Sequence, residues 1–255
     1  MGLVRRDPTT LGLPGARWRL ADVARCEAAV RTYSRSGLSR ALRRLGLRLK
    51  RGRLRLHSPD PAYAPKAARI AAAVRAARTE PTQRVVLFAD EVSLHRQPTL
   101  AQRWAQRGVE PTADLPRQYD SRWRVCAGLD AVSGQVVWRG MPRCGVRELQ
   151  QWLRLVRQTY PTQQLSIVWD NWLPHRQREV QAEADRLGID LLFLPTYAPW
   201  LNPIEKLWRW LRQDVVHHHR LTDNWEELKA RMTRFLDQFT GPAPDLLRYV
   251  GLQSD

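Results

Sequence analysis

Two apolar runs in the sequence each stop at an aspartate. Residues 85–89 are followed by Asp90, and residues 165–169 are followed by Asp170. Such runs predict buried strands, and ligands of parallel sheets gather at the carboxyl ends of the strands. If the two strands are parallel neighbours, both carboxylates lie at one end of the sheet. Crowded carboxylates repel each other, and a hard divalent cation, above all Mg²⁺, relieves the repulsion.

Glu205 is the candidate for a third ligand, delivered by the first turn of a predicted helix. The same residues admit a structural interpretation. Asn202, Pro203, Ile204 and Glu205 have the arrangement of a capping box, with Asn202 as the N-cap and Glu205 three positions later. Taken alone, this arrangement favours the cap, and spacing does not decide between the two roles.

Asp90 and Glu91 are adjacent acids, and either is a candidate for the functional one. Side chains alternate between the two faces of a strand, so at most one of the pair points into the site. An aspartate after a strand is also common as a turn or cap residue.

The segments around these acids predict an alternating α/β fold. Residues 174–187 have the pattern of an amphipathic helix, residues 189–194 form a second apolar strand, and a further helix starts near Pro203. This order is typical of a parallel sheet.

The rest of the second half of the chain extends this pattern. Residues 103–110 predict a strand or an edge segment, and residues 123–130 and 135–139 an antiparallel pair. Residues 225–239 predict a late helix. Residues 146–160 predict a helix whose inward side chains are Leu149, Trp152, Leu153 and Val156.

Positive charge is concentrated in the first third of the chain. Residues 1–80 carry 19 Lys and Arg against 5 Asp and Glu, a net charge of +14 out of +17 for all 255 residues. So basic a segment beside a nearly neutral one predicts a nucleic-acid-binding module joined to a second domain. The alternatives are a disordered basic arm and contact with an anionic membrane.

Apolar spacing in this basic segment predicts a helix-turn-helix. Residues 20–33 and 38–45 have helical patterns, and residues 34–37 break them. The second helix of such a unit enters the major groove of DNA. Its arginines away from the apolar face are Arg40, Arg43 and Arg44.

The next stretch alternates apolar and basic residues around a possible turn at Arg51 and Gly52. This pattern predicts the β-hairpin of a winged helix, and an extended basic strand is the alternative. The side chains expected at DNA phosphates are those of Arg48, Lys50, Arg51, Arg53 and Arg55.

Three motifs together resemble the DDE transposases of the Tc/mariner superfamily, with the bacterial insertion-sequence-630 family as the nearest branch. They are FADE, then WDN with a histidine five residues after the aspartate, then LPTYAPWLNPIEKLW. Between Asp170 and Glu205 lie 34 residues, the separation of that family's second and third acids. The resemblance covers about residues 10 to 215.

The resemblance implies a mixed α/β, ribonuclease H-like catalytic domain with Asp90, Asp170 and Glu205 as catalytic and metal-binding residues. It further implies two Mg²⁺ ions, for which Mn²⁺ can substitute, and in-line phosphoryl transfer on double-stranded DNA. Cut-and-paste transposition at TA sites by a homodimer is the expected activity. The residues expected beside the acids, helping to hold the site, are Asn171, His175 and Asn202.

The expected domains are a (winged) helix-turn-helix over residues 1–60, a linker helix over 61–80, the catalytic domain over 81–240 and a tail over 241–255. Full-length relatives in the family carry two helix-turn-helix units, and this chain has room for one. It begins where the second unit would, which puts recognition of the element's ends in question more than the chemistry.

Three scattered cysteines and no apolar run near the ~20 residues of a membrane span predict a protein of the reducing cytoplasm. The resemblance further implies a bacterial protein that is on the nucleoid when bound to DNA. Two other functions remain open. One is an inactive or domesticated DNA-binding protein of the same fold, which the intact acids disfavour. The other is a structure-specific nuclease.

Overall fold

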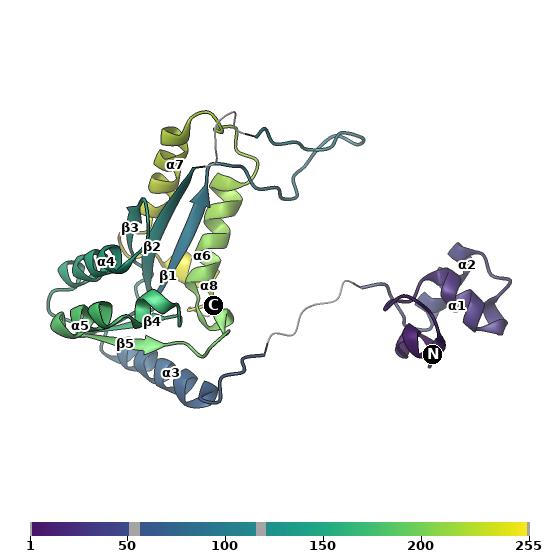
Figure 1. The fold of residues 1–255 in the computed structure, drawn as a ribbon, viewed down its shortest axis with the longest axis horizontal. Coiled ribbons are helices and arrows are strands. Elements are labelled where there is room, and N and C mark those ends of the chain that lie inside the picture. Colours follow the sequence, from purple (N-terminus) through teal and green to yellow (C-terminus); the bar gives the residue numbers. More distant parts are fainter. Residues whose placement is uncertain (1, 51–56, 116–120, 254–255) are drawn as a thin grey trace. The chain divides into compact units, whose positions relative to one another are not determined.

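The chain forms two compact units, Met1–Arg55 and Leu56–Asp255 (Figure 1). The structure is a computed structural model that describes residues 2–50, 57–115 and 121–253. None of the helices in these ranges has the length and apolar character that crossing a membrane requires.

The first unit is mainly helical. Helix α1 (Leu20–Cys26) packs against α2 (Arg35–Arg44), and the buried apolar side chains include Val23 and Leu38. Three short 3₁₀ helices complete the unit: η1 (Leu3–Arg5), η2 (Pro8–Leu11) and η3 (Ala28–Val30).

The break between the two predicted helices differs from the expectation. Helix α1 ends at Cys26, well before residue 33, and Ser34 begins α2 instead of breaking it. The Ser34 hydroxyl accepts a hydrogen bond from the Gly37 amide at 3.1 Å, which satisfies one of the amides left open at a helix start. Leu45, predicted on the apolar face, is exposed.

The predicted wing lies mostly outside the described residues. Residues 47–50 contain no strand, and the side chain of Leu49 is fully exposed. Residues 51–56, which include Arg51, Arg53 and Arg55, are not described.

The second unit is built on a five-stranded sheet with strand order β3-β2-β1-β4-β5. Strands β1 (Arg84–His95), β2 (Arg122–Asp130) and β3 (Val136–Met141) pair antiparallel, and the turn at Gly134 (φ 76°) is the one predicted. Strands β4 (Gln164–Trp169) and β5 (Ile189–Phe193) continue the sheet in parallel from β1. The predicted antiparallel pair is present, and β1 and β4 are parallel neighbours, which is the condition for Asp90 and Asp170 to lie at one end of the sheet.

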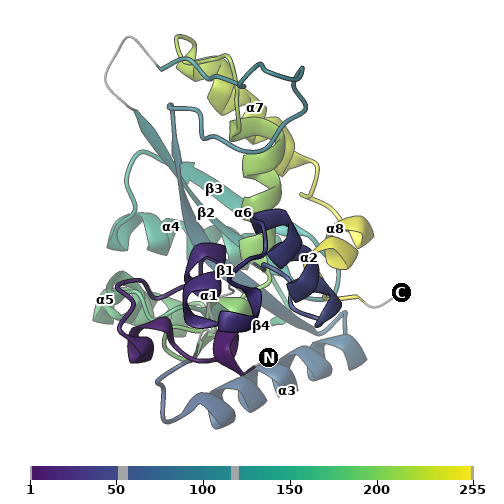
Figure 2. The ribbon, with the colours of Figure 1, turned by 90° about the vertical axis from the view of Figure 1, so that its right-hand side faces the viewer.

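Helices cover both faces of the sheet (Figures 1 and 2). Helices α4 (Val146–Thr159) and α5 (Arg178–Arg186) pack on one face, where the predicted inward residues of α4 are fully buried. The other face carries α6 (Ile204–Leu211), α7 (Trp225–Asp237), α8 (Pro244–Val250) and, in a separate cluster, α3 (Tyr63–Thr79). Helix α6 runs on into a π-helix, Arg212–Val216.

The predicted linker and the predicted tail both contain helices that pack in the second unit. Helix α3, predicted as a linker, buries Ile70, Val74 and Ala77 against β1 and β5. These residues recur at helical spacing, so the sequence pattern already indicates that one face of this helix is buried. Helix α8 lies in the predicted tail and buries Leu246 and Val250.

Two predicted elements have another form. Residues 103–110 contain no strand. Strand β1 instead runs on to His95 and pairs directly with β2. The helix predicted over residues 174–187 is divided into a 3₁₀ turn, η4 (Leu173–Arg176), and α5. Gln177, between them, has extended backbone angles.

Candidate active site

Asp90 lies inside strand β1 and not at its tip. The predicted strand stops at Ala89, but β1 continues to His95 because its second half still pairs with β2, with Asp90 opposite Ala127. The parallel pairing with β4 ends at Phe88 and Val168. Asp90 therefore comes just after the point where β1 loses one neighbour, and Asp170 directly follows the end of β4.

The three predicted acids line one cleft of about 390 Å³. Asp90 comes from β1, Asp170 from the end of β4, and Glu205 from the first turn of α6. The loop after β5 forms another wall, with Pro195 and Tyr197 among its residues. Asn171 and Asn202, predicted beside the acids, also line the cleft.

Glu205 is not the cap of α6. The helix starts at Ile204 after Pro203, and no side chain caps it. The Asn202 amide, predicted as N-cap, donates instead to the backbone oxygen of Ala89 at 3.0 Å and so ties the start of α6 to β1 beside Asp90. The capping-box interpretation is wrong, because Asn202 Oδ1, the acceptor that would cap the helix, has no hydrogen-bond partner in the described structure. Glu205 remains exposed in the cleft.

Helix α6 also holds Asp90 in place. Trp208, one turn after Glu205, donates its indole N–H to Asp90 Oδ2 at 2.9 Å. Burial, together with the negative charges of Glu91 and Glu205, raises the pKa of Asp90 to about 8. A nearby cation would favour its charged form. Residues three apart on a helix share a face, which is the only signal by which the sequence could have indicated Trp208.

His175 is fully buried between two acids. Its Nδ1 is 2.9 Å from Asp170 Oδ1 and its Nε2 is 3.0 Å from Glu91 Oε2. Burial alone would lower the pKa of His175, but the hydrogen bonds and charges of Asp170 and Glu91 raise it to about 9. Burial would likewise raise the pKa of Asp170, but its hydrogen bonds to His175 and the Trp172 amide lower it.

Asn171 lines the cleft, whereas Glu91 lies on the opposite face of the sheet. The Asn171 amide donates to the Leu194 backbone oxygen at 2.6 Å, and its oxygen accepts from Arg176 at 2.7 Å, so it ties the loop after β4 to the end of β5. Glu91 lies on the opposite sheet face from Asp90, as alternation predicts, and contacts His175 there. The sequence indicates Glu91 only as an alternative to Asp90, and no local pattern predicts its contact with His175.

The donor chemistry of the cleft fits a hard divalent cation. Carboxylate oxygens are the ligands that Mg²⁺ and Mn²⁺ prefer, and the buried Asn202 Oδ1 has no hydrogen-bond partner in the described structure. Among the described residues, no three His, Cys, Asp or Glu side chains are already close enough together to hold one ion. The like-charged carboxylates therefore share the cleft without forming a closed ligand set.

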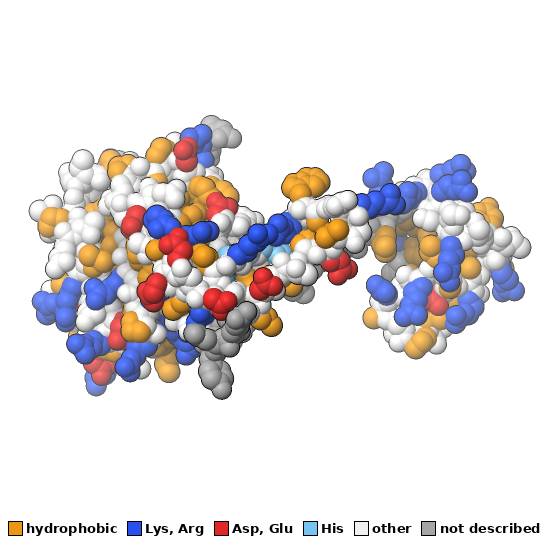
Figure 3. All heavy atoms as spheres, turned by 90° about the horizontal axis from the view of Figure 1, so that it is seen from above, with side chains coloured by type: hydrophobic (Ala, Val, Ile, Leu, Met, Phe, Trp, Pro, Cys, Tyr) orange, Lys and Arg blue, Asp and Glu red, His pale blue; other side chains and the backbone are white. Residues whose placement is uncertain are grey.

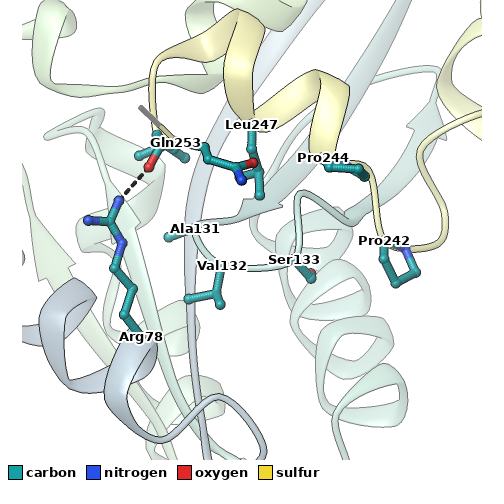
Figure 4. A pocket seen from close by; sticks show the side chains of 9 residues that line it. Arg78, Ala131, Val132, Ser133, Pro242, Pro244, Leu247 and Gln253 are labelled. Atoms are coloured by element: carbon teal, nitrogen blue, oxygen red, sulfur yellow. Dashed lines mark hydrogen bonds between the residues drawn. The ribbon is translucent and has the colours of Figure 1, made fainter. Parts of the chain in front are cut away.

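A second pocket, of about 450 Å³, lies beside the start of β1, between the turn after β2 and helix α8 (Figure 4). There Arg78 donates a hydrogen bond to the backbone oxygen of Leu252. None of the described residues that line this pocket is an acid, a histidine or a cysteine. It therefore lacks the groups that metal binding or acid–base chemistry requires.

The chain matches a family model described as DDE superfamily endonuclease over residues 85–229. This range contains all three acids of the cleft. The chain belongs to the DDE superfamily endonucleases.

The predicted branch of this superfamily is supported by a curated relative. The chain is 24% identical over 236 residues to the insertion element IS630 uncharacterized 39 kDa protein of Shigella sonnei, covering 89% of this chain and 66% of the relative. It thus spans slightly less than two thirds of that relative's length. The predicted resemblance to the insertion-sequence-630 transposases is confirmed.

Solved structures of Mos1 transposase share the fold. A Mos1 paired-end complex with the left transposon end covers 94% of this chain and 76% of that chain, at 17% identity and a TM-score of 0.62. A Mos1 mariner paired-end complex with Mn has a TM-score of 0.64 at 17% identity, covering 94% and 77%. The predicted ribonuclease H-like fold is therefore confirmed.

Proposed function

We propose that the chain is a transposase that cleaves DNA strands and joins them to a target by metal-dependent, in-line phosphoryl transfer. The observation that carries the proposal is the meeting of Asp90, Asp170 and Glu205 in one cleft from three separate elements. Family membership and Mos1 structures described as containing Mn and Mg support a divalent metal.

Each acid has a distinct support for its role in this proposal. Asp90 is fixed by Trp208, Asp170 is oriented by His175, and Glu205 is carried by a helix whose start is tied to β1 through Asn202. These three carboxylates would hold two Mg²⁺ ions, or Mn²⁺ in their place. When bound, such a pair activates a water or a DNA 3′-hydroxyl and stabilises the leaving oxygen.

The first unit is the proposed DNA-binding module. Arg40, Arg43 and Arg44 are exposed on or at the end of α2, and Arg48 and Lys50 follow them in exposed positions. Lys and Arg side chains outnumber acidic ones on the visible face of this unit in Figure 3. We assign α2 to the major groove and the basic residues after it to phosphates, by analogy with helix-turn-helix docking.

Excision of an element with terminal inverted repeats, insertion at TA dinucleotides and action as a homodimer on nucleoid DNA complete the proposal. The sequence resemblance supports these points, and the similarity to Mos1 paired-end and strand-transfer complexes supports action on transposon ends.

Strand cleavage by the intact chain tests this function. With a plasmid that carries the coding region and its flanking DNA, we expect cuts at the ends of the element in Mg²⁺ or Mn²⁺. Cleavage should stop with EDTA and resume with excess Mg²⁺. DNA that is bound but not cut in either metal would favour the non-catalytic DNA-binding protein, and cuts that follow DNA structure at other places would favour a nuclease.

The salt dependence of DNA binding tests the assignment of the first unit. Each phosphate contact contributes about 0.9 to the slope of log affinity against log salt for B-DNA. Replacing Arg40, Arg43 and Arg44 together with glutamine should therefore flatten the slope by up to about 3 units. Binding is measured by fluorescence anisotropy on duplex DNA across a salt series.

The matched control for this triple variant is Arg75→Gln, Arg178→Gln and Arg209→Gln, which removes equal charge from exposed positions of the second unit. A control that flattens the slope as much as the α2 variant would move the main DNA surface to the second unit.

A further inference from the structure

We propose that Glu91 is a positioning residue of this active site: through His175 it holds the carboxylate of Asp170 in the orientation that metal binding requires. The inference rests on the proposed function, and it gives the two adjacent acids of β1 separate tasks on opposite faces of the sheet. The Asp90 side chain lines the cleft, and the Glu91 side chain acts on Asp170 through His175 from the opposite face of the sheet.

Glu91 is a carboxylate held by three donors from three elements. Its side chain is 10% exposed. Oε2 accepts a hydrogen bond from His175 Nε2 at 3.0 Å, and Oε1 accepts from the Trp169 indole N–H and the Cys126 thiol, each at 3.2 Å. Since a mostly buried carboxylate with donors on both oxygens cannot easily rotate, Glu91 is a fixed reference point.

The ring of His175 transmits this fixed position to Asp170. Each ring nitrogen lies at hydrogen-bond distance from a carboxylate oxygen, so the ring bridges Glu91 and Asp170. The ring stacks on Trp169 with centroids 3.9 Å apart, and the edge of Trp172 packs against it at 5.3 Å. Held by two acids and two indoles, the ring has one orientation.

As a result, the two carboxylate oxygens of Asp170 have different surroundings. Its side chain is half exposed, and in the described structure the contacts of its carboxylate, from His175 Nδ1 and the Trp172 amide, all go to Oδ1. Oδ2 is left for the cleft. Replacing a group that hydrogen-bonds to a metal ligand and orients it typically lowers metal affinity or activity by about 10- to 100-fold.

The local structure around His175 is consistent with this role. The segment after β4 forms the short turn η4 in place of the first turn of a longer helix, and His175 is its buried residue. The extended Gln177 then starts α5 as a separate helix. The continuous amphipathic helix predicted for residues 174–187 is thus interrupted at Gln177, two residues after the histidine that links Glu91 to Asp170.

Glu91→Gln tests the proposal because it keeps the shape of the side chain and removes its charge. Glutamine offers one acceptor and one NH₂ group, so it cannot accept from all three donors. We expect Mn²⁺ affinity, measured from the free Mn²⁺ signal in electron paramagnetic resonance, and the cleavage rate each to fall about 10- to 100-fold. DNA affinity without metal should stay at the wild-type value.

Glu183→Gln is the matched control. Glu183 is also a buried acid on this side of the sheet, and it pairs with Arg154 at 2.6 Å and Arg186 at 2.7 Å without lining the cleft. It should leave Mn²⁺ affinity unchanged. An equal loss of Mn²⁺ affinity in both variants would mean that any destabilisation of this side of the sheet weakens metal binding. That result would overturn the proposal.

A double variant with His175→Gln shows whether Glu91 acts through the histidine. Because the effect of Glu91 requires His175, the double variant should bind Mn²⁺ as weakly as His175→Gln alone. Additive losses would contradict the proposed connection.

If Glu91→Gln does not fold, Glu91→Asp replaces it. This variant keeps the charge and withdraws the carboxylate by one methylene, and it should also lose Mn²⁺ affinity. Wild-type Mn²⁺ affinity in a folded Glu91 variant would overturn only the positioning role. A wild-type chain that neither binds Mn²⁺ nor cleaves DNA would overturn the proposed function as well.

Discussion

Glu205→Gln is expected to leave the protein folded and DNA-bound while metal-dependent cleavage nearly disappears. Glutamine has the size and helix preference of glutamate but is a poor ligand for a hard cation. Metal ions contribute several kcal/mol of transition-state stabilisation, and a loss of about 4 kcal/mol corresponds to a roughly thousandfold slower reaction.

The structure separates this result from a loss of stability. Removal of a helix cap typically costs about 0.5–2 kcal/mol, but the Glu205 side chain does not cap α6. The melting temperature of Glu205→Gln should therefore equal that of the wild type. Thermal melts and cleavage time courses on the same preparations provide both measurements.

The control for this variant is Glu226→Gln in the first turn of α7. Glu226 is an exposed glutamate at an equivalent helix position, outside the cleft, with Lys229 as its ion-pair partner. It should cleave at the wild-type rate. If Glu205→Gln also cleaved normally, Glu205 would be a surface residue and the site would contain two acids.

Much of the fold could be predicted because burial follows periodicity. The four inward residues of α4 are all fully buried, and two apolar runs indicate β1 and β4, which pair in parallel in the structure. The extension of β1 was missed because the charged pair Asp90 and Glu91 looks like the end of a strand. Val92 and Leu94 continue the apolar alternation, and β2 supplies the partner that no local pattern reveals.

The acids of the site could be predicted, but their supports could not. Asp90, Asp170 and Glu205 stand out because of their position after apolar runs and their spacing. The roles of Asn202, Trp208 and Glu91 depend on contacts between segments far apart in the sequence. For Asn202 the local pattern was misleading, since its NH₂ group contacts β1 and its oxygen does not cap α6.

The Asp170 carboxylate is proposed to hold catalytic metal, and Asp170→Asn tests this role with little change in the shape of the side chain. The amide oxygen of the substituted side chain can still accept from His175 and from the Trp172 amide, the two donors that Asp170 Oδ1 has in the wild type. The backbone after β4 should therefore keep its conformation, and only the negative charge and the anionic ligand are lost. Because the cleft is proposed to face DNA phosphates, DNA binding should be unchanged or tighter.

Asp190→Asn is the appropriate control, since Asp190 is a similarly exposed aspartate on β5 that pairs with Arg69 outside the cleft. It should bind and cleave as the wild type does.

The decisive measurement is the rate of Mg²⁺-dependent strand cleavage by Asp170→Asn on DNA that it demonstrably binds. We expect a rate lowered at least about a thousandfold, which corresponds to about 4 kcal/mol in the barrier, with DNA affinity at least equal to that of the wild type. Cleavage at the wild-type rate would contradict it.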